Sequence, residues 1–413
     1  MKYNKWTVAL ATVGLINLSS AVQAEESNNS MMTALSSTTL SGYVNTSAIW
    51  RPGTSSSSIP GRAFDGPASK QDGFNLDVVS LTISKPVSEG DWGAGYVAQL
   101  WFGPDANAFN TSSPTLAGGS ADFAVKQAYV DLHAPIGNGL DIKLGHFNYI
   151  GGYEVPDAGD NPNYSRSFAW TMEPASHTGL LLTYKVFDSL TLMGGVANTF
   201  NNGVNWRAAR FNGTPAGSPS ETEKTYMAMV MLTAPESWGF LKGATLTGTI
   251  VNGLNNASGN AGSSLTTGHI TCSQFSATLP MPVKGLTLGL SYDYEDGPNL
   301  PFAALGTDTR SKYVNVTTVY LMYQATEKLK LNVRGEYTSA SSGFWYAPTA
   351  TSHNAELLGL TGTIDYSLWK NVVSRLEVRW DHSLNGDRPY GGSATPPSQK
   401  NEVTVAANII YKF

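Results

Sequence analysis

The stretch VSRLEVRWDHSL, residues 373–384, has charged and apolar side chains in alternation. Arg375, Glu377, Arg379 and Asp381 occupy every second position, and an apolar or aromatic residue stands between each of them and the next. Successive side chains of a β-strand point to opposite faces, so this segment predicts a strand with one wet face and one apolar face. The composition of the rest of the chain indicates which class of protein contains such a strand.

Composition favours a membrane protein built from strands. The chain carries 42 glycines, 19 tyrosines and 10 tryptophans with only 14% charged residues, which is unusual for a soluble domain. Beyond the N-terminal segment no window approaches ~20 apolar residues, which excludes a membrane protein built from helices. A membrane-spanning β-strand needs only about 9–11 residues with one apolar face, and many segments of this chain satisfy that requirement.

The alternation recurs in about sixteen segments, and long and short connections alternate strictly between them. This is the layout of an outer-membrane barrel with long external loops and short periplasmic turns. We therefore predict an all-β, antiparallel transmembrane β-barrel over residues 39–413, with fourteen or eighteen strands as alternatives to sixteen. The predicted strands are 40–50, 74–85, 92–102, 125–134, 140–146, 178–185, 190–198, 225–234, 244–252, 269–278, 286–294, 313–324, 329–338, 356–368, 373–384 and 402–413.

The N-terminal residues predict export. Two lysines, an apolar run too short to span a bilayer and a small residue at Ala24 have the form of a cleaved secretory signal over residues 1–24. Residues 25–38 are polar and small, as in a flexible periplasmic lead-in. The expected location is the cell outer membrane, with its lipid as one partner.

The remaining composition argues against several function classes. A net charge of −5 gives no basic surface for nucleic acid. A single cysteine, Cys272, excludes an intramolecular disulfide. The six histidines show no metal-ligand spacing, and the serines lack a Gly-x-Ser-x-Gly context. We therefore expect no enzyme activity, no metal site and no cofactor.

The longest break in the alternation is FNYIGGYEVPDAGDNPNYSRSFAWTMEPASH, residues 147–177. Its three prolines prevent it from forming a central strand or a long helix, and loops of this length tend to be functional. It falls between the fifth and sixth predicted strands, so it is the third external loop. We expect it to fold into the lumen, and a loop that merely covers the mouth is the alternative. Its charged residues are the candidate pore constriction: Glu154, Asp157, Asp160, Arg166 and Glu173.

The charged strand faces predict a wet lumen. A charge that faces lipid at mid-depth costs roughly 2–4 kcal/mol, so Arg334, Arg375 and Arg379 must look into the barrel. One hypothesis is that these arginines form a basic wall that faces the acids of the third loop across a narrowed pore. The alternative is that they pair with the lumen acids of their own strands, Glu336, Glu377 and Asp381.

Aromatic residues recur near the predicted strand ends. They are interpreted as interfacial girdles, and an aromatic track that binds sugars is the alternative. The residues are Trp50, Trp92, Tyr96, Tyr292, Tyr294, Trp380 and Tyr411.

Several short stretches resemble the putative beta-barrel porin-2 (OmpL-like) family of outer-membrane porins. They are LSGYVNTS (40–47), FNLDVVSLTISKP (74–86), VKQAYVDL (125–132), DIKLGHF (141–147) and the residues Gly152, Tyr153 and Glu154. The resemblance implies a pore for small solutes in a Gram-negative envelope. It also implies that the barrel-assembly machinery recognises the chain through Tyr411 and Phe413. General porins are homotrimers with a Pro-Glu-Phe-Gly-Gly motif in the third loop, which residues 156–159 match only in part.

Three functions are consistent with this pattern. The first is a passive diffusion channel for small polar solutes and ions. The second is a narrower, solute-specific outer-membrane channel. The third, of another class, is a structural or partner-holding barrel or a surface adhesin.

Overall fold

The computed structural model describes residues 37–54, 62–65, 70–87, 92–109, 122–201, 203–209, 219–255, 268–298, 311–346, 354–391 and 397–413. The predicted signal, residues 1–24, and nearly all of the predicted lead-in, residues 25–38, lie outside these ranges.

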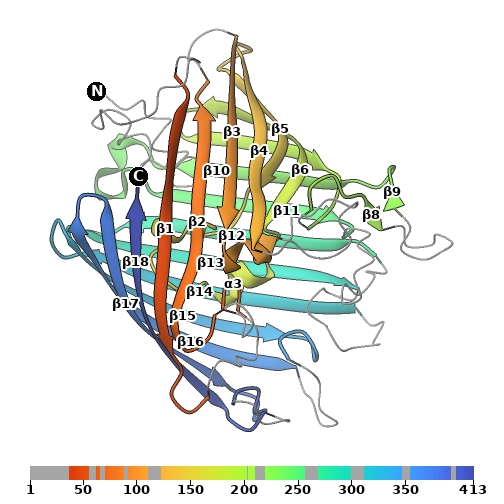
Figure 1. Ribbon diagram of the computed structural model, residues 1–413. Helices are drawn as coiled ribbons and strands as arrows, with labels where there is room; N and C mark the ends of the chain where they lie inside the picture. The colour runs from red at the N-terminus through yellow and green to blue at the C-terminus, as the bar shows by residue number, and fades with distance from the viewer. Residues whose placement is uncertain are drawn as a thin grey trace.

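Sixteen strands of the described chain close into one antiparallel barrel, as the alternation predicts (Figure 1). Each barrel strand pairs with the barrel strands before and after it in the chain, with β10 following β7 in the ring, and β1 also pairs with β18. The strands are β1 (Thr39–Trp50), β2 (Gly73–Lys85), β3 (Gly93–Phe102), β4 (Phe123–Ala134), β5 (Leu140–Asn148), β6 (Ser176–Phe187), β7 (Leu190–Ala197), β10 (Thr225–Thr233), β11 (Thr245–Gly253), β12 (Ile270–Pro280), β13 (Leu286–Pro298), β14 (Ser311–Gln324), β15 (Leu329–Ala340), β16 (Ala355–Trp369), β17 (Val372–Ser383) and β18 (Asn401–Lys412).

The first and last strands complete the ring. The register of β1 and β18 runs from Tyr43 opposite Lys412 to Trp50 opposite Val405. One residue beyond β18, the Phe413 N–H donates to the Gly42 carbonyl at 3.0 Å, and the Gly42 N–H donates back at 2.9 Å. A closed ring leaves no strand edge unpaired, which is what a hydrocarbon environment requires.

The two faces of the strands divide as predicted. On β15, Asn332, Arg334 and Glu336 are buried inside the barrel, whereas Leu331 and Val333 are exposed on its outside. Strands β17 and β18 show the same division. The outer face is therefore the apolar, lipid-facing surface, and the charges look inward.

Part of the inner wall is apolar. On β10 the inward residues are Met227, Met229 and Met231, each at most 4% exposed. Val251 on β11 and Val314 on β14 extend the same buried cluster. This apolar part of the lumen lies under the third loop, so packing rather than water covers it.

Short elements lie in the connections. They are the 3-10 helices η1 (Pro104–Phe109), η2 (Ala158–Asp160) and η3 (Glu236–Leu241), the short helix α3 (Phe168–Met172), and the two-stranded sheet of β8 (Ala208–Ala209) and β9 (Pro219–Ser220). Figure 1 shows α3 within the ring of strands, with β8 and β9 at its periphery. Among the helices of the described ranges, none is long and apolar enough to cross a membrane.

Candidate pore constriction

The third loop, residues 149–175, passes through the lumen and is bound to the opposite wall. Its Glu154 accepts a hydrogen bond from Arg334 Nη1 on β15 at 2.8 Å and from the Tyr320 hydroxyl on β14 at 3.1 Å. Arg334 is completely buried and Glu154 is 4% exposed. This buried ion pair joins residues 180 positions apart in the chain and fixes the loop inside the barrel.

Carboxylates of the wall accept hydrogen bonds from the backbone N–H groups of the loop. Glu377 on β17 accepts from the N–H of Tyr164 at 2.6 Å and of Ser165 at 3.0 Å. Glu336 on β15 accepts from the N–H of Phe168 at 2.6 Å. Buried backbone groups without secondary structure need such partners, and the wall supplies them with charge-assisted hydrogen bonds.

Arginines of the wall bind the loop carbonyls in the same way. Arg375 donates to the carbonyls of Ala158 at 2.8 Å and Asn161 at 3.0 Å. Arg379 donates to the carbonyl of Arg166 at 2.6 Å, and Arg334 donates to the carbonyl of Ser165 at 2.6 Å. The arginines of the predicted basic wall therefore contact mainly the backbone of the loop.

The acids of the loop bind cations on other strands. Asp157 lies 3.3 Å from Lys126 Nζ on β4, and its Oδ1 accepts from Gln99 on β3 at 2.9 Å. Asp160 lies 3.2 Å from Lys412 Nζ on β18. The loop is thus bound on both sides of the lumen, and only Glu154 pairs with an arginine of the predicted wall.

Apolar contacts hold the middle of the loop. The Ser167 side chain caps α3 by accepting from the Trp170 N–H at 3.1 Å. Phe168 is fully buried, packs on Trp345 with ring centroids 5.3 Å apart, and lies 4.9 Å from the Arg379 guanidinium. This helix sits on the apolar part of the inner wall.

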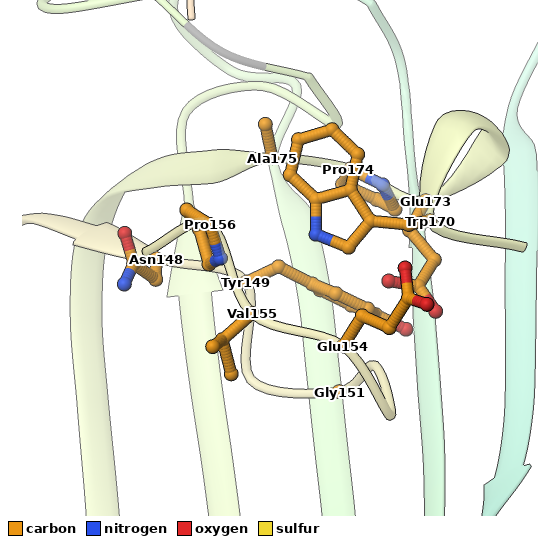
Figure 2. Close-up of a pocket in the computed structure, with 10 residues that line it drawn as sticks. All are labelled: Asn148, Tyr149, Gly151, Glu154, Val155, Pro156, Trp170, Glu173, Pro174 and Ala175. Carbon is orange, nitrogen blue, oxygen red and sulfur yellow. The ribbon is translucent and has the colours of Figure 1, made fainter. Parts of the chain in front are cut away.

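Glu173 and Glu154 line a small cavity between the two ends of the loop, together with Tyr149 and Trp170 (Figure 2). Its volume is about 20 Å³, room for about one water molecule. The loop turns beside it at Gly152, whose φ of +88° favours glycine, and an added Cβ would lie 2.6 Å from Glu173 Oε2. Burial and the adjacent Asp293 carboxylate raise the pKa of Glu173 well above its usual value.

Most candidate site residues come together here. Arg334, Arg375 and Arg379 pair with Glu336, Asp365 and Asp381 and also bind the loop. Arg166 donates to the carbonyls of Pro156 and Tyr164, within its own loop. No group of three His, Cys, Asp or Glu in the described ranges could hold a metal ion. Further cations that contact the loops or the inner wall were not predicted from the sequence: Arg51, Arg62, Lys70, Lys126 and Lys412.

Two of these residues lie where the alternation of side chains is interrupted or absent. Lys126 falls in a predicted strand, but a shift in the pairing between Gln99 and Leu100 of β3 displaces its position in the alternation. Arg62 lies in a long connection, where no alternation of polar and apolar residues indicates which side chains turn inward.

The closed ring agrees with a comparison to family models. The model of "Putative beta-barrel porin-2, OmpL-like" matches residues 37–413, nearly the whole chain. The chain belongs to this porin family. It is therefore an outer-membrane porin, and it resides in the outer membrane. A search of curated proteins finds no match.

Solved structures of porins and related channels share the fold. The outer membrane channel DcaP of Acinetobacter baumannii is 12% identical with a TM-score of 0.57, and the match covers 91% of this porin and 97% of DcaP. The anion-selective porin from Comamonas acidovorans is 10% identical with a TM-score of 0.57, covering 91% and 99%. OmpT of Vibrio cholerae is 9% identical with a TM-score of 0.53, covering 92% and 100%. At these identities the likeness concerns the fold alone.

Proposed function

We propose that this porin is a passive diffusion channel for small polar solutes and ions, narrowed by its third loop. The constriction comprises Glu154, Asp157, Asp160, Arg166 and Glu173 of the loop, the basic residues Arg334, Arg375 and Arg379, and the acids Glu336, Glu377 and Asp381. The observation that carries the proposal is the set of hydrogen bonds between the loop backbone and inward side chains of β15 and β17. A loop held in this way reduces the open section of the lumen.

Selection in such a channel requires no covalent chemistry. A barrel of sixteen strands is too wide for its side chains alone to fill, so a water-filled path remains unless loops obstruct it. Passage then depends on the diameter of the path and on the electrostatic barriers of the charges that line it.

The test is electrical. The purified porin is inserted into a planar bilayer, and single-channel currents are recorded with and without a salt gradient. A diffusion channel gives discrete current steps that grow with salt concentration, whereas a partner-holding barrel or adhesin stays silent. A solute-specific channel differs in that one solute blocks the current in a saturable manner.

We also infer a homotrimer in the membrane. One solved structure of OmpT of Vibrio cholerae, 10% identical with a TM-score of 0.50, is described as a trimer form. The measurement is the mass of the detergent-solubilised porin after chemical crosslinking. A single-barrel mass under mild extraction contradicts the trimer and leaves the channel proposal standing.

A further inference from the structure

The described residues of the first loop, 51–54, 62–65 and 70–72, include one segment that lies against the inner wall of the barrel. Its Arg62 donates through Nη1 to Asp381 Oδ2 at 2.6 Å and through Nη2 to Glu402 Oε1 at 3.2 Å. Asp381 on β17 and Glu402 on β18 are 2% and 1% exposed, and Arg62 is 5% exposed. A buried guanidinium of the first loop is therefore bound to the inner wall.

The position of this contact follows from the strand register. Asp381 and Glu402 are directly opposite each other in the pairing of β17 and β18. Like charges that face each other across strands destabilise a sheet, and Arg62 bridges the two carboxylates. Both lie closer to the long-loop end of their strands than Arg375 and Arg379, which bind the third loop. Arg62 is thus bound nearer the barrel mouth than these anchors of the third loop.

The neighbouring residues rest directly on the third loop. The Phe64 ring lies 4.8 Å from the Trp170 ring, and the Arg166 guanidinium lies 5.2 Å from the Phe64 ring. The Ala63 N–H donates to Thr171 Oγ1 in α3 at 3.2 Å. Phe64 has a φ of +61°, a conformation that bulky residues adopt only when their surroundings require it.

Ion pairs hold both ends of the first loop. Arg51 pairs with Asp65 and, at 3.2 Å, with Asp72. Lys70 Nζ lies 2.7 Å from Asp105 of η1 and 3.5 Å from Asp77 of β2. The described part of this loop is therefore tied to the wall at several points.

We propose that the first loop is a second element of the constriction, in which Arg62 and Phe64 determine access to the third loop. The inference rests on the proposed diffusion channel, because it states which residues a solute meets first. Arg62 also supplies one positive charge between Asp381 and Glu402, which pair in addition with Arg379 and Arg51, so it contributes to the charge that an ion meets at this level.

The first test compares single-channel currents of variants. Arg62→Ala removes the bridge, so we expect a higher conductance and a zero-current potential shifted toward cation preference. Phe64→Ala is expected to raise the conductance without the shift in potential. Arg388→Ala is the matched control, an exposed arginine in the loop between β17 and β18 that donates only to the Ser398 carbonyl among the described residues. Heat-modifiable gel mobility verifies that each barrel is folded.

The second test locates the loop without any current measurement. Ala63→Cys and Thr171→Cys are combined, and a short thiol crosslinker is added to the folded porin, in which the native Cys272 is completely buried. We expect an efficient crosslink and wild-type conductance, since the loop already rests on α3. Absence of the crosslink overturns the inference, as does wild-type current in Arg62→Ala. A silent wild-type protein counts against the diffusion channel instead, and the crosslink then still reports the position of the loop.

Discussion

Arg334 joins the barrel wall to the third loop through a single buried guanidinium. It donates to Glu154 of the loop at 2.8 Å, to Glu336 of its own strand at 2.9 Å and to the Ser165 carbonyl at 2.6 Å. Removal of one partner of a buried ion pair typically costs about 3–5 kcal/mol, because the other charge stays buried and unpaired. The stability of the loop inside the lumen therefore depends strongly on this residue.

We predict that Arg334→Met releases the third loop while the barrel still forms. The expected result is new protease cleavage within residues 149–175 and a larger, noisier single-channel current. Lys330→Met is the control, because Lys330 occupies the same face of β15 but is exposed. Equal protease resistance of the two variants would contradict the role given to Arg334.

Glu173 makes the loop sensitive to pH. Burial and the Asp293 carboxylate raise its pKa, so the folded protein binds a proton that the unfolded chain releases above pH 4.5. Such a group stabilises the folded state below its usual pKa, and this contribution is lost as the pH rises through the raised value. The loop should accordingly be held more firmly in acid than in alkali.

We predict that current noise in the wild type increases as the pH is raised from about 4.5, the usual pKa of glutamic acid. Glu173→Gln should remove most of this increase, because the amide stays neutral at every pH. Glu236→Gln, a change in exposed η3, serves as the control. An identical pH response in all three proteins refutes the assignment to Glu173.

At the scale of elements, the third loop behaves as part of the wall rather than as a free segment. Its carbonyls and N–H groups bind Arg375, Arg379, Glu377 and Glu336 in place of a regular ladder. The sequence predicted its position between the fifth and sixth strands, because the break in alternation is local, and it left open whether the loop folds inward or covers the mouth. The partners could not be predicted, since they come from strands far along the chain.

We predict that deletion of residues 155–163 enlarges the single-channel conductance, because this segment contains η2 and the carbonyls that Arg375 binds. Deletion of residues 208–220 is the comparison, since these residues carry the small sheet of β8 and β9 at the periphery of the ring. Unchanged conductance after the first deletion would mean that the segment does not limit the path.

The strand boundaries illustrate how local the sequence signal is. The predicted strand 373–384 is Val372–Ser383 in the structure, a shift of one residue at each end. The predicted strand 286–294 extends to Pro298, because Glu295 to Pro298 pair with β14 although their composition resembles a turn. Recognition of Tyr411 and Phe413 by the assembly machinery stays a prediction.

At the scale of the whole molecule, the lumen is a network of opposite charges. Arg375 binds Asp365 at 2.9 Å, and Arg379 binds Asp381 at 2.9 Å. The arginines therefore balance wall carboxylates as well as holding the loop, and the transverse field across the pore stays a hypothesis.

We predict that the double variant Arg375→Gln and Arg379→Gln shifts the zero-current potential toward cation preference, since Asp365 and Asp381 lose their counter-charges. Arg388→Gln, outside this network, should leave the potential as in the wild type. Reversal potentials that do not differ between these variants would exclude a contribution of the basic wall to ion selectivity.

The alternation along the chain predicted the barrel and the inward face of most strands, because a period of two is a local property. It left fourteen, sixteen or eighteen strands open, and the pairing of β1 with β18 closes the ring at sixteen. The path of the loops depends on the tertiary structure. Arg334 with Glu154, Arg62 with Asp381, and Arg375 with the Ala158 carbonyl are contacts between distant segments. They form because a closed ring brings opposite walls within reach of a buried backbone whose polar groups need partners.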